Sequence, residues 1–504
     1  MVARTTAAPH TRLFAAKSIV DRLILVSNRG PVTHKLEESG RIRRMDADGG
    51  VAVALASVAR SQPVTWIAGA CTFADRIVAL TGKPVRIGED SYVKLVNLPE
   101  DVYRLFYQSL CNPMLWFVQH GIACELRAEG HDVMSAWETG YVPANLLFAQ
   151  AVIEEIGEDE CAPVMLHDYH LYLVPRMIRD ARPNAVLQQF VHIPWPEPKA
   201  WQILPDEIVS ELCAGLLAND SVVFQTEDSV EAFMATCAAY IEDAEVFRRR
   251  GKIEYQGQMT SVWSNPISVD LQDLQALALS QETQRYFESL KATRHEKTIV
   301  RVDRLDPSKN VLRGLEAYEL LLERRPDLLD RVRFISYLVP SRTGIPEYDN
   351  YGAAVFCKAD HINTRFGTPD WQPVTVHYEQ NRAQAFAGLR LYDVLMVNSV
   401  ADGMNLVSKE GPMVNEMDGV LILSRTAGSY DELNAGALSV DPLDIAATAE
   451  ALEAALEMPK DERRRRAGLL REAIERHQLR DWLRHQTNDL NATRYARQST
   501  AEGI

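Results

Sequence analysis

The seven cysteines of this 504-residue chain form no CxxC pair. A zinc ribbon needs paired cysteines and a disulfide framework needs dense ones, so neither is indicated. Scattered thiols fit a reducing compartment, and we expect a cytoplasmic protein. The cysteines are Cys71, Cys111, Cys124, Cys161, Cys213, Cys237 and Cys357.

The sequence also lacks a long apolar run near its start. Arg4, His10, Arg12 and Lys17 interrupt the first 22 residues, which leaves no signal-peptide core and no membrane span. We expect a loose leader and no membrane partner. The net charge of −15, from 54 basic and 69 acidic residues, provides no overall positive field, so we expect no nucleic-acid partner.

Common nucleotide and metal signatures are missing as well. The chain contains no GxGxxG, no GxxxxGK[ST] and no HExxH, so no dinucleotide fingerprint, P-loop or zincin site is predicted. Internal repeats are absent, which gives solenoid folds little support. The remaining composition is that of an ordinary globular protein, with 46% apolar and 24% charged residues.

Strand-like runs alternate with amphipathic helical patterns through most of the chain. This alternation predicts an α/β fold with parallel sheets covered by helices on both faces. The length predicts two large domains with a cleft between them. The eight clearest strands are 23–28, 162–168, 185–193, 221–226, 297–303, 332–339, 394–399 and 419–424.

A proline-containing extended stretch at 265–270 separates a polar hairpin-like segment from a fresh helical pattern. We therefore expect an N-terminal domain at 1–268 and a C-terminal domain at 269–470. The end of the chain shows helical spacing, many charges and no strand pattern. We expect helices at 471–504 that pack back toward the N-terminal domain.

Polar residues follow the expected strands, at the edge where open α/β sheets bind ligands. Arg29 follows the first strand, and Gly49 and Gly50 precede a helical pattern. Backbone N–H groups and a nearby arginine can bind a phosphate there. A tight turn explains the two glycines equally well, so both interpretations remain open.

Histidines and a carboxylate end two further strands. His167, Asp168 and His170 follow one strand, and a carboxylate there can bind sugar hydroxyls. Metal binding is the rival interpretation, although a third ligand is missing. His192 ends the next strand before Ile-Pro-Trp-Pro, a stiff loop that would hold the imidazole at the sheet edge. A lone histidine in such a place is usually structural.

The run from Arg304 to Glu410 is the most informative. Arg304 and Lys309 lie five residues apart between a strand and a helix, where two cations and a helix N-terminus can hold a diphosphate. They would neutralise the charge on a departing nucleotide diphosphate, and a solvated loop is the alternative. Arg342, after the following strand, could bind a second anion.

The acidic glycine turn from Asp402 to Glu410 completes this set. Its N–H groups and carboxylates suit sugar and ribose hydroxyls, whereas a helix cap is the alternative for Asp402 alone. Glu410 comes eight residues after Asp402, about two helical turns, so we expect both carboxylates on a similar face. With the two cations, this turn predicts a nucleotide-sugar site.

Together these motifs resemble the trehalose-6-phosphate synthase family of retaining glycosyltransferases. The resemblance covers about residues 22–490 and rests on SNRG, Gly49-Gly50, HDYH, VHIPWP, DRLDPSKN, PSR and DGMNLVSKE, in that order. It implies the GT-B fold, with two Rossmann-like domains facing a central cleft and the nucleotide sugar on the C-terminal domain. It also implies no metal, no cofactor and a homo-oligomer.

The resemblance implies the donor-side roles. Arg304 and Lys309 hold the diphosphate, and Glu410 holds the ribose. Asp402, together with the backbone of the turn after it, holds the glucose and phosphate, and His192 meets the donor sugar. That turn consists of Gly403, Met404, Asn405, Leu406 and Val407.

On the acceptor side, the resemblance assigns the sugar hydroxyls to Asp168 and the phosphate mainly to arginines and a tyrosine. The acceptor residues are Arg29, Gly50, Tyr107, Trp116 and Arg342. Two segments depart from the family pattern here. The usual W-x-G-W is Trp66-Ile67-Ala68-Gly69, so glycine replaces one aromatic residue, and the usual LWPxFHY is LWFVQHG.

These observations give three hypotheses. The leading one is a metal-independent enzyme that transfers glucose from a nucleotide diphosphate-glucose to glucose 6-phosphate and forms α,α-trehalose 6-phosphate. The second is a related transferase or pseudo-glycosyltransferase that uses glycerol phosphate or an aminocyclitol phosphate. The third is a non-catalytic regulator that binds sugar phosphates. The motifs do not show whether the donor nucleotide is UDP, GDP or ADP.

Overall fold

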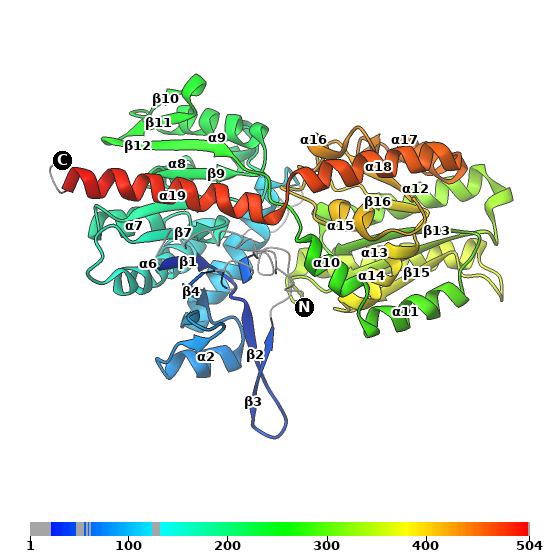
Figure 1. The fold of residues 1–504 in the computed structure, drawn as a ribbon, viewed down its shortest axis with the longest axis horizontal. Helices are drawn as coiled ribbons and strands as arrows, with labels where there is room; N and C mark the ends of the chain where they lie inside the picture. The colour runs from blue at the N-terminus through cyan, green and yellow to red at the C-terminus, as the bar shows by residue number, and fades with distance from the viewer. Residues whose placement is uncertain (1–21, 47–54, 57–58, 60–61, 123–131, 502–504) are drawn as a thin grey trace, which may run out of the picture.

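The computed structural model describes residues 22–46, 55–56, 59, 62–122 and 132–501. Two α/β units lie side by side in it, each built around a central sheet (Figure 1). Buried apolar side chains pack on both faces of both sheets. The expected α/β fold with parallel sheets in two domains is therefore confirmed.

The first sheet has ten strands, in the order β10-β11-β12-β9-β8-β7-β1-β4-β6-β5. Its central strands are parallel, and antiparallel pairs lie at the two edges. The strands are β1 (Leu23–Ser27), β4 (Val64–Gly69), β5 (Val85–Arg86), β6 (Tyr92–Val96), β7 (Pro163–His167), β8 (Val186–Phe190), β9 (Ser221–Phe224), β10 (Glu245–Phe247), β11 (Lys252–Tyr255) and β12 (Gln258–Ser264).

The second sheet has six parallel strands, in the order β15-β14-β13-β16-β17-β18. All eight strands expected from the sequence form, four in each sheet. The strands of this sheet are β13 (Lys297–Arg304), β14 (Val332–Val339), β15 (Val374–Tyr378), β16 (Val394–Val397), β17 (Val420–Ser424) and β18 (Leu438–Val440).

The strand orders determine where each sheet binds ligands. In the second sheet the chain runs outward from β13 in one direction and then restarts at β16 on the other side. In the first sheet the same reversal occurs between β1 and β7. Loops diverge at such switch points and leave a crevice beyond the carboxyl ends of the strands. Arg304 is the last residue of β13, and Arg29, Asp168 and Asp402 follow the other three of these strands.

Helices cover both units, and a separate hairpin, β2 (Val32–Leu36) with β3 (Ile42–Asp46), projects from the first (Figure 1). None of the described helices is long and apolar enough to cross a bilayer. The first unit contains α2 (Phe73–Leu80), α3 (Glu100–Tyr103), α4 (Trp116–Gln119), α5 (Val133–Ala136), α6 (Val142–Ile156), α7 (Val174–Ala181), α8 (Asp206–Leu216) and α9 (Glu227–Tyr240).

The second unit begins after a linker. β12 ends at Ser264 and α10 begins at Leu271, and we propose the domain boundary at residues 268 and 269 between them. The later helices are α10 (Leu271–Ala278), α11 (Gln281–Ala292), α12 (Val311–Arg324), α13 (Pro346–Phe366), α14 (Arg382–Leu391), α15 (Val407–Val414), α16 (Tyr430–Leu433), α17 (Ile445–Glu457), α18 (Lys460–Arg476) and α19 (Leu479–Ala501).

The last helix returns to the first unit. α18 lies along the second unit, and α19 then runs across the first, where it packs on β7 and β8 (Figure 1). Asp489 of α19 accepts hydrogen bonds from Gln188 Nε2 at 2.7 Å and from Ser221 Oγ at 2.5 Å. Because Gln188 and Ser221 are buried in the sheet, this carboxylate fastens the end of the chain to the first unit.

Replacing Asp489 by alanine should lower the free energy of unfolding by about 1–3 kcal/mol, because it removes the acceptor of the buried Ser221 hydroxyl and leaves Gln188 Nε2 only its 3.4 Å bond to the Gln486 carbonyl oxygen. The measurement is the midpoint of chemical denaturation. Arg484→Ala, an exposed change on the same helix, is the control and should stay within about 0.5 kcal/mol of the wild type. Equal midpoints for both variants would contradict the proposed fastening.

Candidate active site

The turn between β13 and α12 carries the two predicted diphosphate cations. Arg304 is the last residue of β13, and Lys309 is the last residue of a short 3₁₀ helix, η7 (Pro307–Lys309). Asp306 caps this helix and accepts from the N–H of Ser308 at 3.0 Å. The cap holds the backbone from which both cations extend.

A buried arginine supports this turn. Arg301 is completely buried, and it donates to Asp303 at 2.9 Å and to the carbonyl oxygen of Lys309 at 2.8 Å. It also donates to Asn398, just after β16, at 3.1 Å. Arg301 therefore connects β13 and the turn that carries Lys309 to the segment just after β16, the other strand of the switch point.

Lys309 forms an ion pair with Asp402, which connects the cationic turn to the acidic glycine turn. The Asp402 carboxylate is buried and also accepts from Asn405 Nδ2 at 2.9 Å and from Ser399 Oγ at 3.3 Å. Burial raises the pKa of Asp402, but the Lys309 charge and the hydrogen bonds lower it further, so the net pKa lies below its usual value. Asp402 therefore remains an ionised acceptor at neutral pH.

The acidic glycine turn packs directly on the first unit. A Cβ atom on Gly403 would lie 2.0 Å from the carbonyl oxygen of His192, so this close approach requires glycine. Met404 is buried in an apolar cluster that it shares with the first sheet. Leu406 then caps α15, and Val407 is its first residue. The predicted sugar-binding turn thus lies at the junction of the two units.

Glu410 lies in the first turn of α15, where its carboxylate is 3.6 Å from the guanidinium of Arg382. Burial raises the pKa of Glu410, and Arg382 opposes this effect. The expectation that Asp402 and Glu410 share a helical face is wrong. α15 begins only at Val407, and Asp402 lies in the non-helical turn before it.

Among the residues predicted for the acceptor side, Arg29 donates to Tyr107 Oη at 3.1 Å. The Tyr107 ring stacks on Tyr103, with centroids 5.4 Å apart, and on His170 at 6.0 Å. Interaction with Tyr107 raises the pKa of Arg29, which therefore remains a cation. Gly50 and its neighbouring glycine lie outside the described residues, so the anion site expected there stays a prediction.

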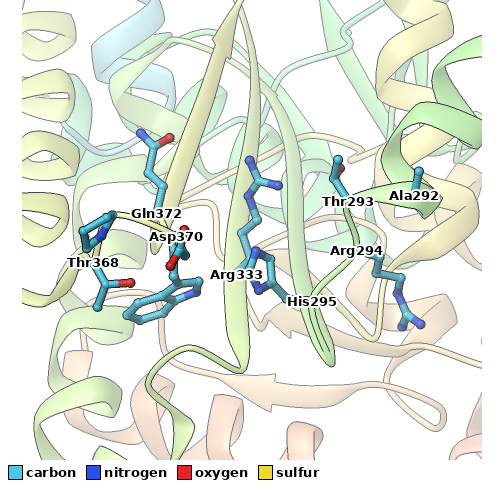
Figure 2. A pocket seen from close by; sticks show the side chains of 10 residues that line it. Ala292, Thr293, Arg294, His295, Arg333, Thr368, Asp370 and Gln372 are labelled. Atoms are coloured by element: carbon cyan, nitrogen blue, oxygen red, sulfur yellow. The ribbon is translucent and has the colours of Figure 1, made fainter.

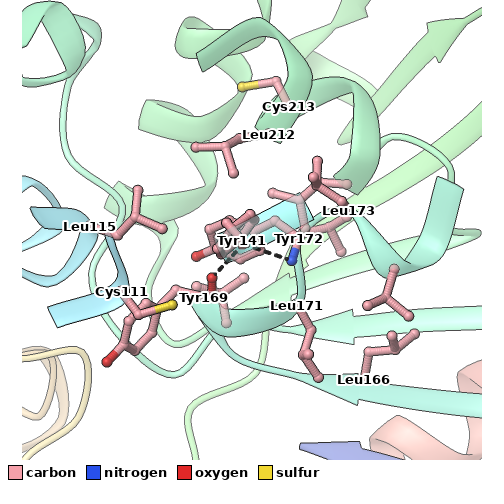
Figure 3. Packing of buried hydrophobic residues seen from close by; sticks show 14 of the residues in the cluster. Cys111, Leu115, Tyr141, Leu166, Tyr169, Leu171, Tyr172, Leu173, Leu212 and Cys213 are labelled. Carbon is pink, nitrogen blue, oxygen red and sulfur yellow. Dashed lines mark hydrogen bonds between the residues drawn. The ribbon is translucent and has the colours of Figure 1, made fainter. Parts of the chain in front are cut away.

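Asp168 lies at the carboxyl end of β7 with φ 71°, a backbone conformation that is uncommon for a residue other than glycine. Its N–H donates to the carbonyl oxygen of Phe190 at 2.8 Å. The backbone just after Asp168 is held by Tyr141, whose hydroxyl donates to the carbonyl oxygen of Tyr169 and accepts from the N–H of Tyr172 (Figure 3). Burial raises the pKa of Asp168 to about 6.

His192 is held by a chain of hydrogen bonds that begins at the linker between the units. The N–H of Ile267 donates to Gln225 Oε1 at 2.9 Å, which leaves Gln225 Nε2 to donate to His192 Nδ1 at 3.4 Å. His192 Nε2 then carries the proton and lies 3.2 Å from His167 Nδ1. Burial lowers the pKa of both histidines, so His192 is neutral. The predicted contact of an imidazole nitrogen of His192 with the donor sugar would replace one of these two hydrogen bonds.

The sequence interpretation missed Asp306, which contacts residues predicted for the acceptor side and lies in the turn predicted for the donor side. Trp116 Nε1 donates to its carboxylate at 3.2 Å, and Arg342 forms an ion pair with it. The Arg342 guanidinium lies 3.9 Å from the centroid of the Trp116 ring, and that of Arg304 lies 5.0 Å from it. The sequence feature that could have pointed to Asp306 is its position, because it is an aspartate in a helix-capping place between two predicted phosphate-binding cations.

A cavity of about 530 Å³ lies at the amino ends of the strands of the second sheet, opposite the ends that carry the predicted site (Figure 2). It is lined by the loops before β13 and β15 and by Arg333 near the start of β14. Its position at the amino ends of these strands separates it from the turn that carries Arg304. Within the described ranges, no cluster of three or more histidine, cysteine or acidic side chains could hold a metal ion.

Two facing Rossmann-like units, with a cationic turn paired to an acidic glycine turn, define a nucleotide-sugar-dependent glycosyltransferase of the GT-B fold. The chain belongs to glycosyltransferase family 20, whose family model matches residues 21–492. An alpha,alpha-trehalose-phosphate synthase (UDP-forming) of Emericella nidulans is 31% identical over 451 residues, 88% of this chain and 86% of the relative.

Solved structures support the same assignment. An alpha,alpha-trehalose-phosphate synthase (UDP-forming) from Burkholderia vietnamiensis matches with a TM-score of 0.82 at 26% identity, over 95% of this chain and 98% of that one. The enzyme from Burkholderia xenovorans, in complex with glucose-6-phosphate, matches with a TM-score of 0.80 at 29% identity, over 93% and 99%. The expected family, fold and enzyme class are confirmed.

The pKa of Asp168 predicts a pH-dependent stability. Its pKa rises from 3.8 to about 6 on folding, which corresponds to at most about 3 kcal/mol. The folded state therefore binds this proton more tightly than the unfolded state does. The resulting contribution to the free energy of unfolding is complete below about pH 4 and is lost as the pH rises through about 6. Compared with Asp168→Asn, the wild type should lose up to this much stability between pH 4 and 7 in denaturation experiments. Parallel pH profiles for the two proteins would contradict the shift.

Proposed function

We propose that this enzyme transfers glucose from UDP-glucose to glucose 6-phosphate and forms α,α-trehalose 6-phosphate with retention of configuration. The Lys309–Asp402 pair carries the proposal, because it connects a diphosphate-binding turn to a sugar-binding turn at a switch point. The names of the relatives support uridine as the base, and the Burkholderia xenovorans complex supports the acceptor. The cytoplasmic location and the homo-oligomer stay predictions.

In the proposed reaction, the anomeric carbon of glucose loses its bond to the diphosphate oxygen and gains a bond to the acceptor hydroxyl on the same face. The hydroxyl proton passes to the departing phosphate oxygen, so no protein nucleophile is needed. Arg304 and Lys309 stabilise the negative charge that develops on the diphosphate. Asp402 and the turn after it position the glucose, and Glu410 binds the ribose.

On the acceptor side, Asp168 accepts from sugar hydroxyls, and the acceptor phosphate binds near Arg29 and Arg342. The hydrogen bond between Arg29 and Tyr107 and the contact between Arg342 and Trp116 place aromatic surfaces beside these cations. Arg342 is nearly buried, and the Trp116 ring limits the access of water to it, which strengthens its charge interactions in the cleft.

Replacing Arg304 or Lys309 by alanine should lower kcat/KM by at least about a hundredfold, because each change removes a cation that stabilises the leaving group. The measurement is mass spectrometry of the disaccharide phosphate formed without added metal and with chelator. Arg324→Ala, a partly exposed cation on α12 paired with Glu450, is the control. Undiminished transfer by both site variants would rule out the proposed diphosphate role.

A second candidate keeps the donor and changes the acceptor. A Cβ on Gly69 would lie 3.0 Å from the Asn28 carbonyl oxygen and 3.4 Å from the Phe148 ring, so an aromatic side chain in this place, where the family pattern has one, would require these neighbours to shift. This observation supports a changed acceptor side.

An acceptor panel separates the two candidates. We expect product from glucose 6-phosphate with UDP-glucose, and less with GDP- or ADP-glucose. Glycerol phosphate and an aminocyclitol phosphate complete the panel. Product from either of these, without product from glucose 6-phosphate, would replace the leading proposal by the second one.

A further inference from the structure

Asp306 is a buried carboxylate between the two cations of the diphosphate turn. It is 0% exposed. Its Oδ1 accepts from the N–H of Ser308 at 3.0 Å and from the Ser308 hydroxyl at 2.8 Å. These bonds within the turn fix the orientation of the carboxylate and keep the backbone before Lys309 in place. The turn alone therefore uses only one side of the group.

The remaining contacts of Asp306 come from the acceptor side. Trp116, which lies in the first unit and is 190 residues away in sequence, donates its indole N–H to Oδ1 at 3.2 Å. Arg342 donates from Nη1 to Oδ2 at 2.5 Å. Burial raises the pKa of Asp306, but the charges of Arg342 and Arg304 lower it further, to below its usual range. The ionised carboxylate is thus shared by both sides of the cleft.

The contact with Asp306 leaves one edge of the Arg342 guanidinium for another anion. Nη1 is used by Asp306, whereas Nε is buried without a hydrogen-bond partner among the described residues. Nη2 makes only a long contact of 3.4 Å with the Tyr169 hydroxyl. Nε and Nη2 lie on the same edge of the planar group, which is the geometry that binds a phosphate through two hydrogen bonds.

We infer that Asp306 is a positioning residue, which holds Arg342 by Nη1 and Trp116 by its indole N–H so that the Nε–Nη2 edge of Arg342 binds the acceptor phosphate. The inference rests on the proposed function for the identity of the acceptor. Asp306 also caps the turn that carries Lys309. One carboxylate thereby sets the relative positions of the acceptor-phosphate and donor-diphosphate sites.

The test is Asp306→Asn, which preserves shape and removes the charge. Glucose 6-phosphate should bind about tenfold or more weakly, since the hydrogen bond from Arg342 loses its charged partner. UDP should bind equally well or more tightly, because removing a negative charge near Arg304 and Lys309 raises the positive potential there. A variant damaged only in its folding would lose both affinities. Calorimetry on the full chain measures both without requiring turnover.

Two further variants separate the role of Asp306 from other effects on binding. Trp116→Phe retains the ring beside Arg342 but removes the indole N–H, and it should weaken glucose 6-phosphate binding less than Asp306→Asn does. Asp393→Asn is the matched control, because Asp393 is also buried and ion-paired, with Arg294 and Arg463, at the amino end of β16. It should leave both affinities unchanged.

Inorganic phosphate separates the inference from the proposed function. If wild-type protein binds phosphate but not glucose 6-phosphate, the proposed acceptor is wrong, and weaker phosphate binding by Asp306→Asn would still support the role of Asp306. Equal affinity of the wild type and Asp306→Asn for phosphate and for glucose 6-phosphate would overturn that role. If the wild type binds UDP but neither of the other two, both the acceptor and the role of Asp306 are wrong.

Discussion

The cleft depends on opposite charges buried in contact with one another. A buried charge without a partner costs several kcal/mol, so each cation here can remain in the interior only beside its carboxylate. The pairing therefore determines where each guanidinium or ammonium group lies before any ligand arrives, and such preorganisation is the main source of electrostatic catalysis. The three pairs are Arg301–Asp303, Lys309–Asp402 and Arg342–Asp306.

These charges have their effect because the two units meet closely around them. Gly403 lies against the backbone of His192, and Trp116 reaches across the junction to Asp306. α19 adds a long connection, since it crosses from the second unit and is anchored in the first by Asp489. The residues proposed for the donor and acceptor sides thus belong to one packed region, although they come from distant parts of the chain.

Much of this arrangement was predictable from the sequence. Apolar β-branched runs identified the central strands, and polar residues at their ends identified Arg304, Lys309 and Asp402, because both patterns are local. Asp306 was missed because a capping aspartate in a turn looks unremarkable until its distant partners are known. The spacing of Glu410 from Asp402 was misread because a helix start cannot be located by residue count alone.

The sequence by itself determined the α/β class, the order of the motifs and their resemblance to one glycosyltransferase family, since these depend on periodicity and on residues close together in the chain. Only the tertiary structure decided which charges pair, which tautomer His192 adopts and which guanidinium nitrogen of Arg342 has no hydrogen-bond partner among the described residues. These features depend on contacts between residues as far apart as Trp116 and Asp306. Burial, which gives such contacts their strength, exists only once the two units have packed together.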